Sequence, residues 1–259
     1  MGMIGPNGAG KTTTIKILMN LIKADRGEVE IFNLTHDKSE KEIKNRIGYV
    51  GEEQYFYENK TVAWTGNFVS RFYTFWDKNE YSRLLNDFQI STTKKVRELS
   101  KGMRVKLSLA IALSHNPDLV ILDEPTSGLD PVIRRELLEL LKRFTEDNNR
   151  SVLISSHITD DIARIADYIT YLVEGRIVLT AEKDELLANW KKIHFKKGCL
   201  GDDLLAGFTH ISEQMFGSCG ITRNYLEIKD RLAEGVARGD VKVENVDLDD
   251  ILISFVKKG

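Results

Sequence analysis

Short apolar runs separated by longer amphipathic segments recur along the first 180 residues. The runs at 47–50, 119–122 and 152–155 have the length of buried strands and are too short for helices. Helical patterns lie between them, as crossovers between parallel strands require. The spacing therefore predicts an α/β core built on a mainly parallel sheet.

Two other segments predict antiparallel pairing. The segment 27–32 alternates apolar and acidic residues, which is typical of a strand with one wet face in a half-exposed antiparallel sheet. Farther along, the apolar segments 168–173 and 176–179 flank Glu174-Gly175. This spacing predicts a hairpin closed by a two-residue turn.

From residue 61 to residue 90 the pattern becomes helical and aromatic. We predict an inserted helical subdomain at about 52–114, with its aromatic stripe packed in the core; alternatively, part of the stripe forms a docking surface for another protein. Four aromatic residues fall near positions i, i+4, i+7 and i+8 of one face: Phe68, Phe72, Phe75 and Trp76.

The composition changes after about Ala188, where lysine pairs and glycines interrupt apolar segments too short for a large core. We therefore predict a main domain at 1–187 and a small α+β appendage at 188–259. The last segment, 247–256, begins with acidic residues and places its apolar residues on one face, which predicts a terminal amphipathic helix.

The charge balance and the cysteine count narrow the function classes. The 259 residues include 37 Lys and Arg against 39 Asp and Glu, so the formal charge is 37 − 39 = −2. The chain has no excess of basic residues that would attract the phosphates of a nucleic acid, so we do not expect nucleic acid as its main partner. The apolar stretches fall short of the roughly 20 residues of a membrane helix. Two cysteines, Cys199 and Cys219, make no disulfide framework, so we expect the cytosol.

Residues 5–12, GPNGAGKT, match the phosphate loop pattern GxxxxGK[ST]. An apolar strand end precedes the match, which is the context of a phosphate-loop NTPase core, and the helical pattern that follows it runs through Ile15, Leu18, Leu21 and Ile22. The backbone N–H groups cradle phosphates, Lys11 reaches the β and γ phosphates, and Thr12 offers its hydroxyl to Mg²⁺. The predicted nucleotide-binding residues here are Asn7, Gly8, Ala9, Gly10, Lys11, Thr12 and Thr13.

Two further segments carry candidate chemistry. The apolar run 119–122 ends in Asp123 and Glu124, at the sheet edge where ligands of α/β folds bind. Asp123 is predicted to hold Mg²⁺, and Glu124 to orient and deprotonate the attacking water. Ser100 and Gly102 open a helix and form a second candidate anion site, although an ordinary capped helix has the same pattern.

In their order and spacing these segments resemble the ATP-binding subunits of ABC transporters over about residues 1–185. The phosphate loop, an LSxG helix start, the strand ending in Asp and Glu, the segment Ser127-Gly128-Leu129-Asp130 and a strand ending at His157 follow one another as in that family. The resemblance implies a head-to-tail pair of subunits with two ATP molecules between them. It implies that Ser100 and Gly102 act on the partner's ATP, that Asp130 lies at the dimer seam, and that His157 contacts the γ-phosphate and holds Glu124.

The chain departs from the family pattern at three places. LSGGQ is LSKGM here, with Lys101 and Met103 replacing Gly and Gln. The position of the usual Gln in the loop after 47–50 holds Glu52, which we predict as a Mg²⁺ contact, with Gln54 as the alternative. Only four residues precede Gly5, so we expect N-terminal strands and the aromatic platform for adenine to be missing, and ATP binding to be weaker.

The resemblance implies an ATP-hydrolysing subunit that drives transport, of the bacterial export type, on the inner face of the cell membrane. It would pair with a second ATP-binding subunit and with separate transmembrane permease subunits. The segment 52–64, with Tyr55, Phe56 and Tyr57, would receive a helix of the permease. Two alternatives stay open: a non-hydrolysing, nucleotide-gated regulatory module, and a soluble ATPase of the same family that acts on ribosomes or DNA.

Overall fold

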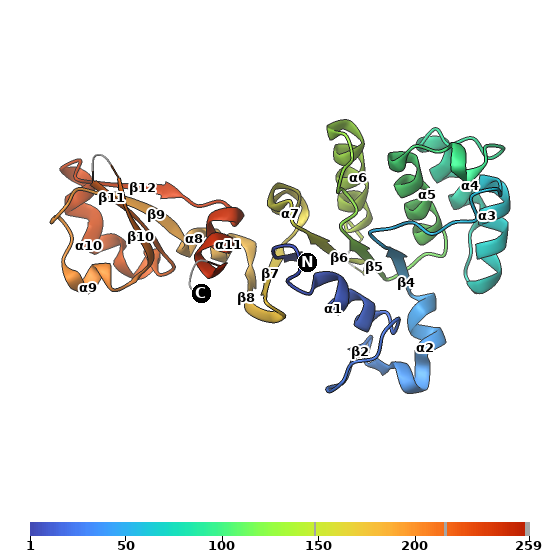
Figure 1. Cartoon of the computed structure of the whole chain (residues 1–259), viewed down its shortest axis with the longest axis horizontal. Coiled ribbons are helices and arrows are strands. Elements are labelled where there is room, and N and C mark those ends of the chain that lie inside the picture. Colours follow the sequence, from blue (N-terminus) through green and yellow to red (C-terminus); the bar gives the residue numbers. More distant parts are fainter. Residues whose placement is uncertain (148, 215–216, 257–259) are drawn as a thin grey trace. The chain divides into compact units, whose positions relative to one another are not determined.

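The computed structural model describes residues 1–147, 149–214 and 217–256. The chain divides into two compact units, Met1–Ile165 and Ala166–Gly259 (Figure 1). The residues predicted to form the phosphate site all belong to the first unit. The predicted domain boundary after residue 187 falls inside the second unit, beyond the hairpin with which that unit begins.

The first unit is built on four parallel strands in the order β4–β5–β6–β1. Their bounds are Ile47–Val50 for β4, Leu119–Asp123 for β5, Ser151–Ser156 for β6 and Gly2–Ile4 for β1. The predicted parallel α/β core is therefore confirmed. The carboxyl ends of β5 and β6 are paired side by side, with Asp123 opposite Ser155.

Helix α1, Lys11–Leu18, packs on this sheet together with α2, His36–Asn45. Ile15, Met19, Ile43, Ile47 and Ile121 form the buried cluster between these helices and the strands. The sequence pattern predicted that α1 would continue to Ile22, which is wrong. Asn20 adopts a left-handed φ of 52°, the chain leaves the helix there, and Leu21 and Ile22 are exposed.

The antiparallel part of the first unit is smaller than predicted. Strand β2 covers Glu30–Ile31 and pairs with β3, Leu34–Thr35, in an antiparallel hairpin. The antiparallel pairing predicted for the segment 27–32 is confirmed, but only two of its residues form the strand.

The helical region contains α3, Val62–Val69, α4, Lys78–Asp87, and α5, Lys101–Leu113, with 3-10 turns at Ser70–Phe72 and Val96–Glu98. These helices gather at one end of the first unit (Figure 1). Thr61, Asp77 and Ser100 cap their N-termini by accepting backbone hydrogen bonds.

The prediction that the aromatic stripe is packed in the core is wrong. Phe72 is 63% exposed and Phe75 is 72% exposed, while Phe68 and Trp76 are partly buried. The helical spacing of these residues does not correspond to one helix, because α3 ends at Val69 and α4 begins only at Lys78. The stripe therefore runs from a helix across a 3-10 turn into a loop, and part of it faces solvent.

Two helices complete the first unit. Helix α6, Pro131–Phe144, begins after Asp130, and α7, Thr159–Ile165, follows the end of β6. Arg134 of α6 forms an ion pair with Asp161 of α7, with 2.5 Å between Nε and Oδ1. Asp161 is fully buried, so this ion pair joins α6 and α7 at a point away from solvent.

The second unit begins with the predicted hairpin, formed by β7, Tyr168–Val173, and β8, Arg176–Glu182. After α8, Lys183–Asn189, come β9, Lys191–Phe195, α9, Asp202–Leu205, β10, Phe208–Gln214, and β11, Gly217–Thr222. Helix α10, Tyr225–Ala237, strand β12, Val241–Asn245, and helix α11, Leu248–Val256, complete the unit.

The strands of this appendage form an antiparallel sheet in the order β10–β11–β9–β12. With α9 and α10 as its crossovers, this is the split βαββαβ arrangement. Ile193, Phe195, Leu204, Leu232 and Val241 form its core. The predicted α+β character and the terminal amphipathic helix are confirmed.

Among residues 1–147, 149–214 and 217–256, none of the helices combines the length and the apolarity that crossing a membrane requires.

Candidate functional site

The phosphate loop joins β1 to α1 and determines where Lys11 lies. Gly10 precedes the helix with a φ of 105°, a conformation that a residue with a Cβ rarely adopts, and so turns the chain into α1. Lys11 is the first residue of the helix and is buried. Its Nζ donates to the carbonyl oxygens of Gly5, at 2.7 Å, and Pro6, at 3.4 Å.

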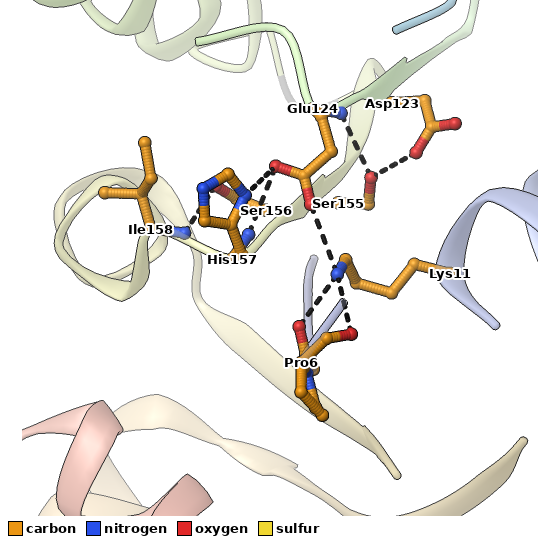
Figure 2. A network of polar contacts seen from close by, with 9 residues as sticks. Pro6, Lys11, Asp123, Glu124, Ser155, Ser156, His157 and Ile158 are labelled. Atoms are coloured by element: carbon orange, nitrogen blue, oxygen red, sulfur yellow. Dashed lines mark hydrogen bonds and ion pairs between the residues drawn. The ribbon is translucent and has the colours of Figure 1, made fainter. Parts of the chain in front are cut away.

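Glu124 lies directly after β5 and joins Lys11 to His157. One carboxylate oxygen, Oε1, lies 3.2 Å from Nζ of Lys11. The other, Oε2, lies 2.7 Å from Nδ1 of His157 and also accepts the His157 backbone N–H at 3.2 Å (Figure 2). Glu124 has a left-handed φ of 48°, a conformation that costs a non-glycine residue energy, and its side chain contacts Lys11 of the phosphate loop.

Asp123 is held by the neighbouring strand. Its Oδ1 accepts a hydrogen bond of 2.6 Å from the Ser155 hydroxyl. Its Oδ2 is buried and has no hydrogen-bond partner within the described residues. Burial, together with the charge of Asp123, raises the pKa of Tyr49 on β4 above its ordinary value. Oδ1 of Asp123 is therefore satisfied by Ser155, whereas the buried Oδ2 keeps its hydrogen-bonding capacity unused.

A cavity of about 480 Å³ opens beside these groups. Glu52 lies at this cavity, whereas Gln54 does not line it and instead donates to the backbone carbonyls of Gly51 and Glu52. The residues that line the cavity come from the phosphate loop, from the first turn of α1 and from the segments that follow β4, β5 and β6: Asn7, Gly8, Ala9, Gly10, Lys11, Thr12, Thr13, Glu52, Glu124, Ser127 and His157.

The structure does not bring Ser100, Gly102 or Asp130 to this cavity within one chain. In the described part of the chain, each has a local structural role. Ser100 caps α5 and Asp130 caps α6 by accepting backbone N–H groups. Gly102 packs closely on α6, where an added Cβ would lie 2.5 Å from Cδ1 of Ile133. Sequence reasoning missed the capping role of Asp130, although Asp before Pro at a helix start is a recognisable signal.

The predicted residues Lys11, Glu124 and His157 are therefore joined by direct contacts, and Asp123 is linked to Glu124 through Ser155. Ser155 is the residue of this network that sequence reasoning did not identify. The sequence signal for Ser155 is a hydroxyl residue at the end of one apolar run, 151–156, which pairs with the apolar run that ends in Asp123.

The oxygen donors suit Mg²⁺, the ion expected beside a phosphate chain. Thr12 and Glu52 offer a hydroxyl and a carboxylate at the cavity. Asp123 does not line the cavity, but its buried Oδ2 has no hydrogen-bond partner within the described residues. Among the residues that the structure describes, no cluster of three or more His, Cys, Asp or Glu could hold a metal alone. Such a site fits an ion that takes its remaining ligands from phosphate and water, as Mg²⁺ does.

Comparison with known proteins identifies the family. Residues 1–127 match the family model of the ABC transporter. The chain is 36% identical over 184 residues to the lantibiotic transport ATP-binding protein SrtF of Streptococcus pyogenes, covering 70% of this chain and 78% of that protein. It is 38% identical over 187 residues to the bacitracin transport ATP-binding protein BcrA of Bacillus licheniformis, covering 71% of this chain and 61% of BcrA.

The fold is similar to that of a solved cassette. The dimeric structure of MJ0796, a bacterial ABC transporter cassette, superposes with a TM-score of 0.62 and 25% identity, covering 70% of this chain and 84% of that one. The sequence and fold comparisons therefore indicate the same family as the order of the motifs along the chain. This chain belongs to the ATP-binding proteins of the ABC transporter family.

Proposed function

We propose that the chain binds and hydrolyses Mg²⁺–ATP as the motor subunit of an export-type ABC transporter. The observation that carries the proposal is the contact of Glu124 with both Lys11 and His157 at the phosphate loop. A carboxylate held by a histidine beside a phosphate cradle has the position that activation of an attacking water requires. ATP turnover measured with and without Mg²⁺ tests the proposal.

Each group has a distinct task in this proposal. The phosphate-loop N–H groups and Lys11 hold the β and γ phosphates, and His157 fixes the carboxylate of Glu124 and reaches toward the γ-phosphate. Glu124 orients the water and accepts its proton. Mg²⁺, held by Thr12, Glu52 and Asp123, would offset the negative charge that develops on the phosphate oxygens.

A second candidate function is that of a nucleotide-gated regulatory module without hydrolysis. It is favoured by the LSKGM segment, in which Lys101 and Met103 replace the Gly and Gln of the family pattern. Turnover separates the two functions. A wild-type chain that binds ATP but shows no hydrolysis, even in the presence of its membrane subunits, would favour the regulatory module.

We further propose that two such chains, or this chain and a sister chain, close head to tail over two ATP molecules. Ser100 and Gly102 lie outside the phosphate-loop cavity of their own chain, which supports action on the partner's nucleotide. The dimeric form of the similar MJ0796 cassette also supports it. Asp130 would lie at the seam between the two chains.

Mixing two inactive variants tests this arrangement. Lys11→Met chains and Ser100→Arg chains should each lose turnover, but a mixture should regain activity because a mixed dimer contains one site with both an intact Lys11 and an intact Ser100. ATPase rates measured across mixing ratios check this. A mixture no more active than its components would contradict action across the dimer, and a mixture of two Lys11→Met preparations is the control.

The partner that completes the transporter is proposed to be a membrane subunit that docks on the exposed aromatic residues of the helical region. Tyr55 is 86% exposed and Tyr57 is 59% exposed. Trp64 and Phe68 stack with their centroids 5.0 Å apart, and Tyr57 contacts both edge-on. A rigid aromatic group that remains exposed fits a protein interface. Through this partner the chain would reside at the inner face of the cell membrane.

Replacing Tyr57 with Ala should leave ATP binding unchanged and weaken association with the membrane subunit. The reason is that Tyr57 lies outside the residues lining the phosphate cavity but packs on the Trp64 and Phe68 rings. Co-purification with the membrane subunit, and transport in vesicles, measure the effect. Tyr168→Ala, at a tyrosine of similar exposure in the second unit, is the matched control. Equal recovery of the membrane subunit with both variants would reject this docking site.

The names of the relatives suggest the cargo class. BcrA is named for bacitracin transport and SrtF for lantibiotic transport. We propose that this chain serves efflux of peptide antibiotics or similar amphipathic molecules, with the cargo itself bound by the membrane subunits.

A further inference from the structure

Ser155 lies between the two acidic residues of the site and contacts both. It is the fifth residue of β6, is fully buried, and is paired in register with Asp123 of β5. Its hydroxyl donates to Oδ1 of Asp123 at 2.6 Å and accepts the backbone N–H of Glu124 at 3.1 Å. Figure 2 shows this hydroxyl between the carboxylate of Asp123 and the backbone N–H of Glu124.

The single proton of the Ser155 hydroxyl determines which carboxylate oxygen of Asp123 is left without a hydrogen-bond partner. A serine has one O–H donor and two acceptor lone pairs. Because the donor is directed at Oδ1, the buried Oδ2 is the carboxylate oxygen left without a partner in the described part of the chain. Without this bond the carboxylate could rotate and would present neither oxygen in a fixed direction.

The contact with Glu124 acts on the backbone. The N–H of Glu124 is shared between the Ser155 carbonyl, at 3.1 Å, and the Ser155 hydroxyl, at 3.1 Å. Glu124 has a φ of 48°, so hydrogen bonds at its N–H help to hold a conformation that the residue does not favour. The carbonyl bond survives any substitution at Ser155, and the hydroxyl bond does not.

We propose that Ser155 is a positioning residue that orients Asp123 toward the metal of bound Mg²⁺–nucleotide, with a smaller effect on Glu124. The inference rests on the proposed function, because it concerns the metal of that site. Partners that hydrogen-bond a metal-ligating carboxylate typically change metal affinity 10- to 100-fold when they are removed. The hydroxyl of Ser155 bonds to Asp123 and Glu124 and not to the loop around Lys11, whose N–H groups donate to the nucleotide phosphates.

The experiment measures metal binding apart from turnover. Wild-type chain and Ser155→Ala are saturated with ADP, and Mn²⁺ binding is followed by electron paramagnetic resonance; ADP affinity in EDTA is measured in parallel with a fluorescent ADP analogue. The half-saturating Mn²⁺ concentration should rise about 10- to 100-fold in Ser155→Ala. ADP affinity in EDTA should stay within about twofold, because the phosphate cradle keeps its contacts.

Ser114→Ala is the matched control, since Ser114 is also fully buried and spends its hydroxyl on the carbonyl of Ala110, in α5. Unchanged Mn²⁺ affinity in a folded Ser155→Ala would overturn the proposal. Should that variant fail to fold, Ser155→Cys, which keeps a weak donor of similar size, should bind Mn²⁺ with intermediate affinity, and wild-type affinity there would also overturn it. A wild-type chain that binds no nucleotide, with or without metal, would instead refute the proposed function.

Discussion

Glu124→Gln is expected to slow ATP hydrolysis by about 10²–10⁴-fold while ATP stays bound, because the amide cannot accept the proton of the attacking water. The substitution keeps the size of the side chain and an oxygen that can still contact Lys11 or His157. With hydrolysis blocked and binding intact, the chain should accumulate as an ATP-bound dimer. Single-turnover hydrolysis and size-exclusion chromatography with Mg²⁺–ATP measure the two effects.

Glu139→Gln provides the control for this experiment. Glu139 lies on α6, is 60% exposed and pairs with Arg135, four residues earlier. It should hydrolyse ATP at the wild-type rate. If Glu124→Gln retained more than about a tenth of that rate, Glu124 would not be the general base.

Lys11→Met is expected to reduce stability as well as nucleotide binding. Lys11 and Glu124 are 6% and 8% exposed, so removing the cation leaves a buried carboxylate with only His157 as its partner. Breaking a buried ion pair from one side typically costs about 3–5 kcal/mol of unfolding free energy. Losing a charged hydrogen-bond donor to phosphate, worth about 1.5–3 kcal/mol, should weaken ATP binding about 10- to 150-fold.

Urea unfolding without nucleotide separates these two effects. The double variant Lys11→Met/Glu124→Gln should recover much of the lost stability, because it removes the stranded charge, yet should still bind ATP weakly. Lys16→Met, at an exposed lysine of the same helix, is the control. Equal unfolding midpoints for wild type and Lys11→Met would show that the Lys11–Glu124 contact does not stabilise the empty site.

The sequence predicted the parallel strands and their carboxyl-end acids well because both depend on local patterns. The apolar run 119–122 is short, rich in Leu, Val and Ile, and lies between helical patterns, which is enough to predict a strand; the acids after it then lie at the carboxyl edge of the sheet. The contact between Glu124 and Lys11 depends on the order of strands in the sheet, and the family's order of motifs predicted the convergence of these residues without any coordinates.

The aromatic stripe shows where local pattern fails. Helical spacing from Phe68 to Trp76 gave no sign that α3 ends at Val69, because a 3-10 turn followed by a loop can keep similar spacing. The predicted length of α1 was wrong for a related reason, because nothing in the apolar pattern marks the left-handed conformation at Asn20. Ser155 escaped detection because its role is visible only once β5 and β6 are paired.

The double contact of Glu124 has a consequence for the nucleotide cycle that we propose. When ADP and phosphate leave, the ammonium of Lys11 would not remain as an uncompensated cation in the cavity, because the carboxylate of Glu124 already lies within ion-pair distance. The protein thus carries its own counter-charge, and the departing product need not be retained to keep the pocket neutral. Release of the product and binding of the next nucleotide would then each exchange one anion for another beside Lys11, the phosphate in one case and the Glu124 carboxylate in the other.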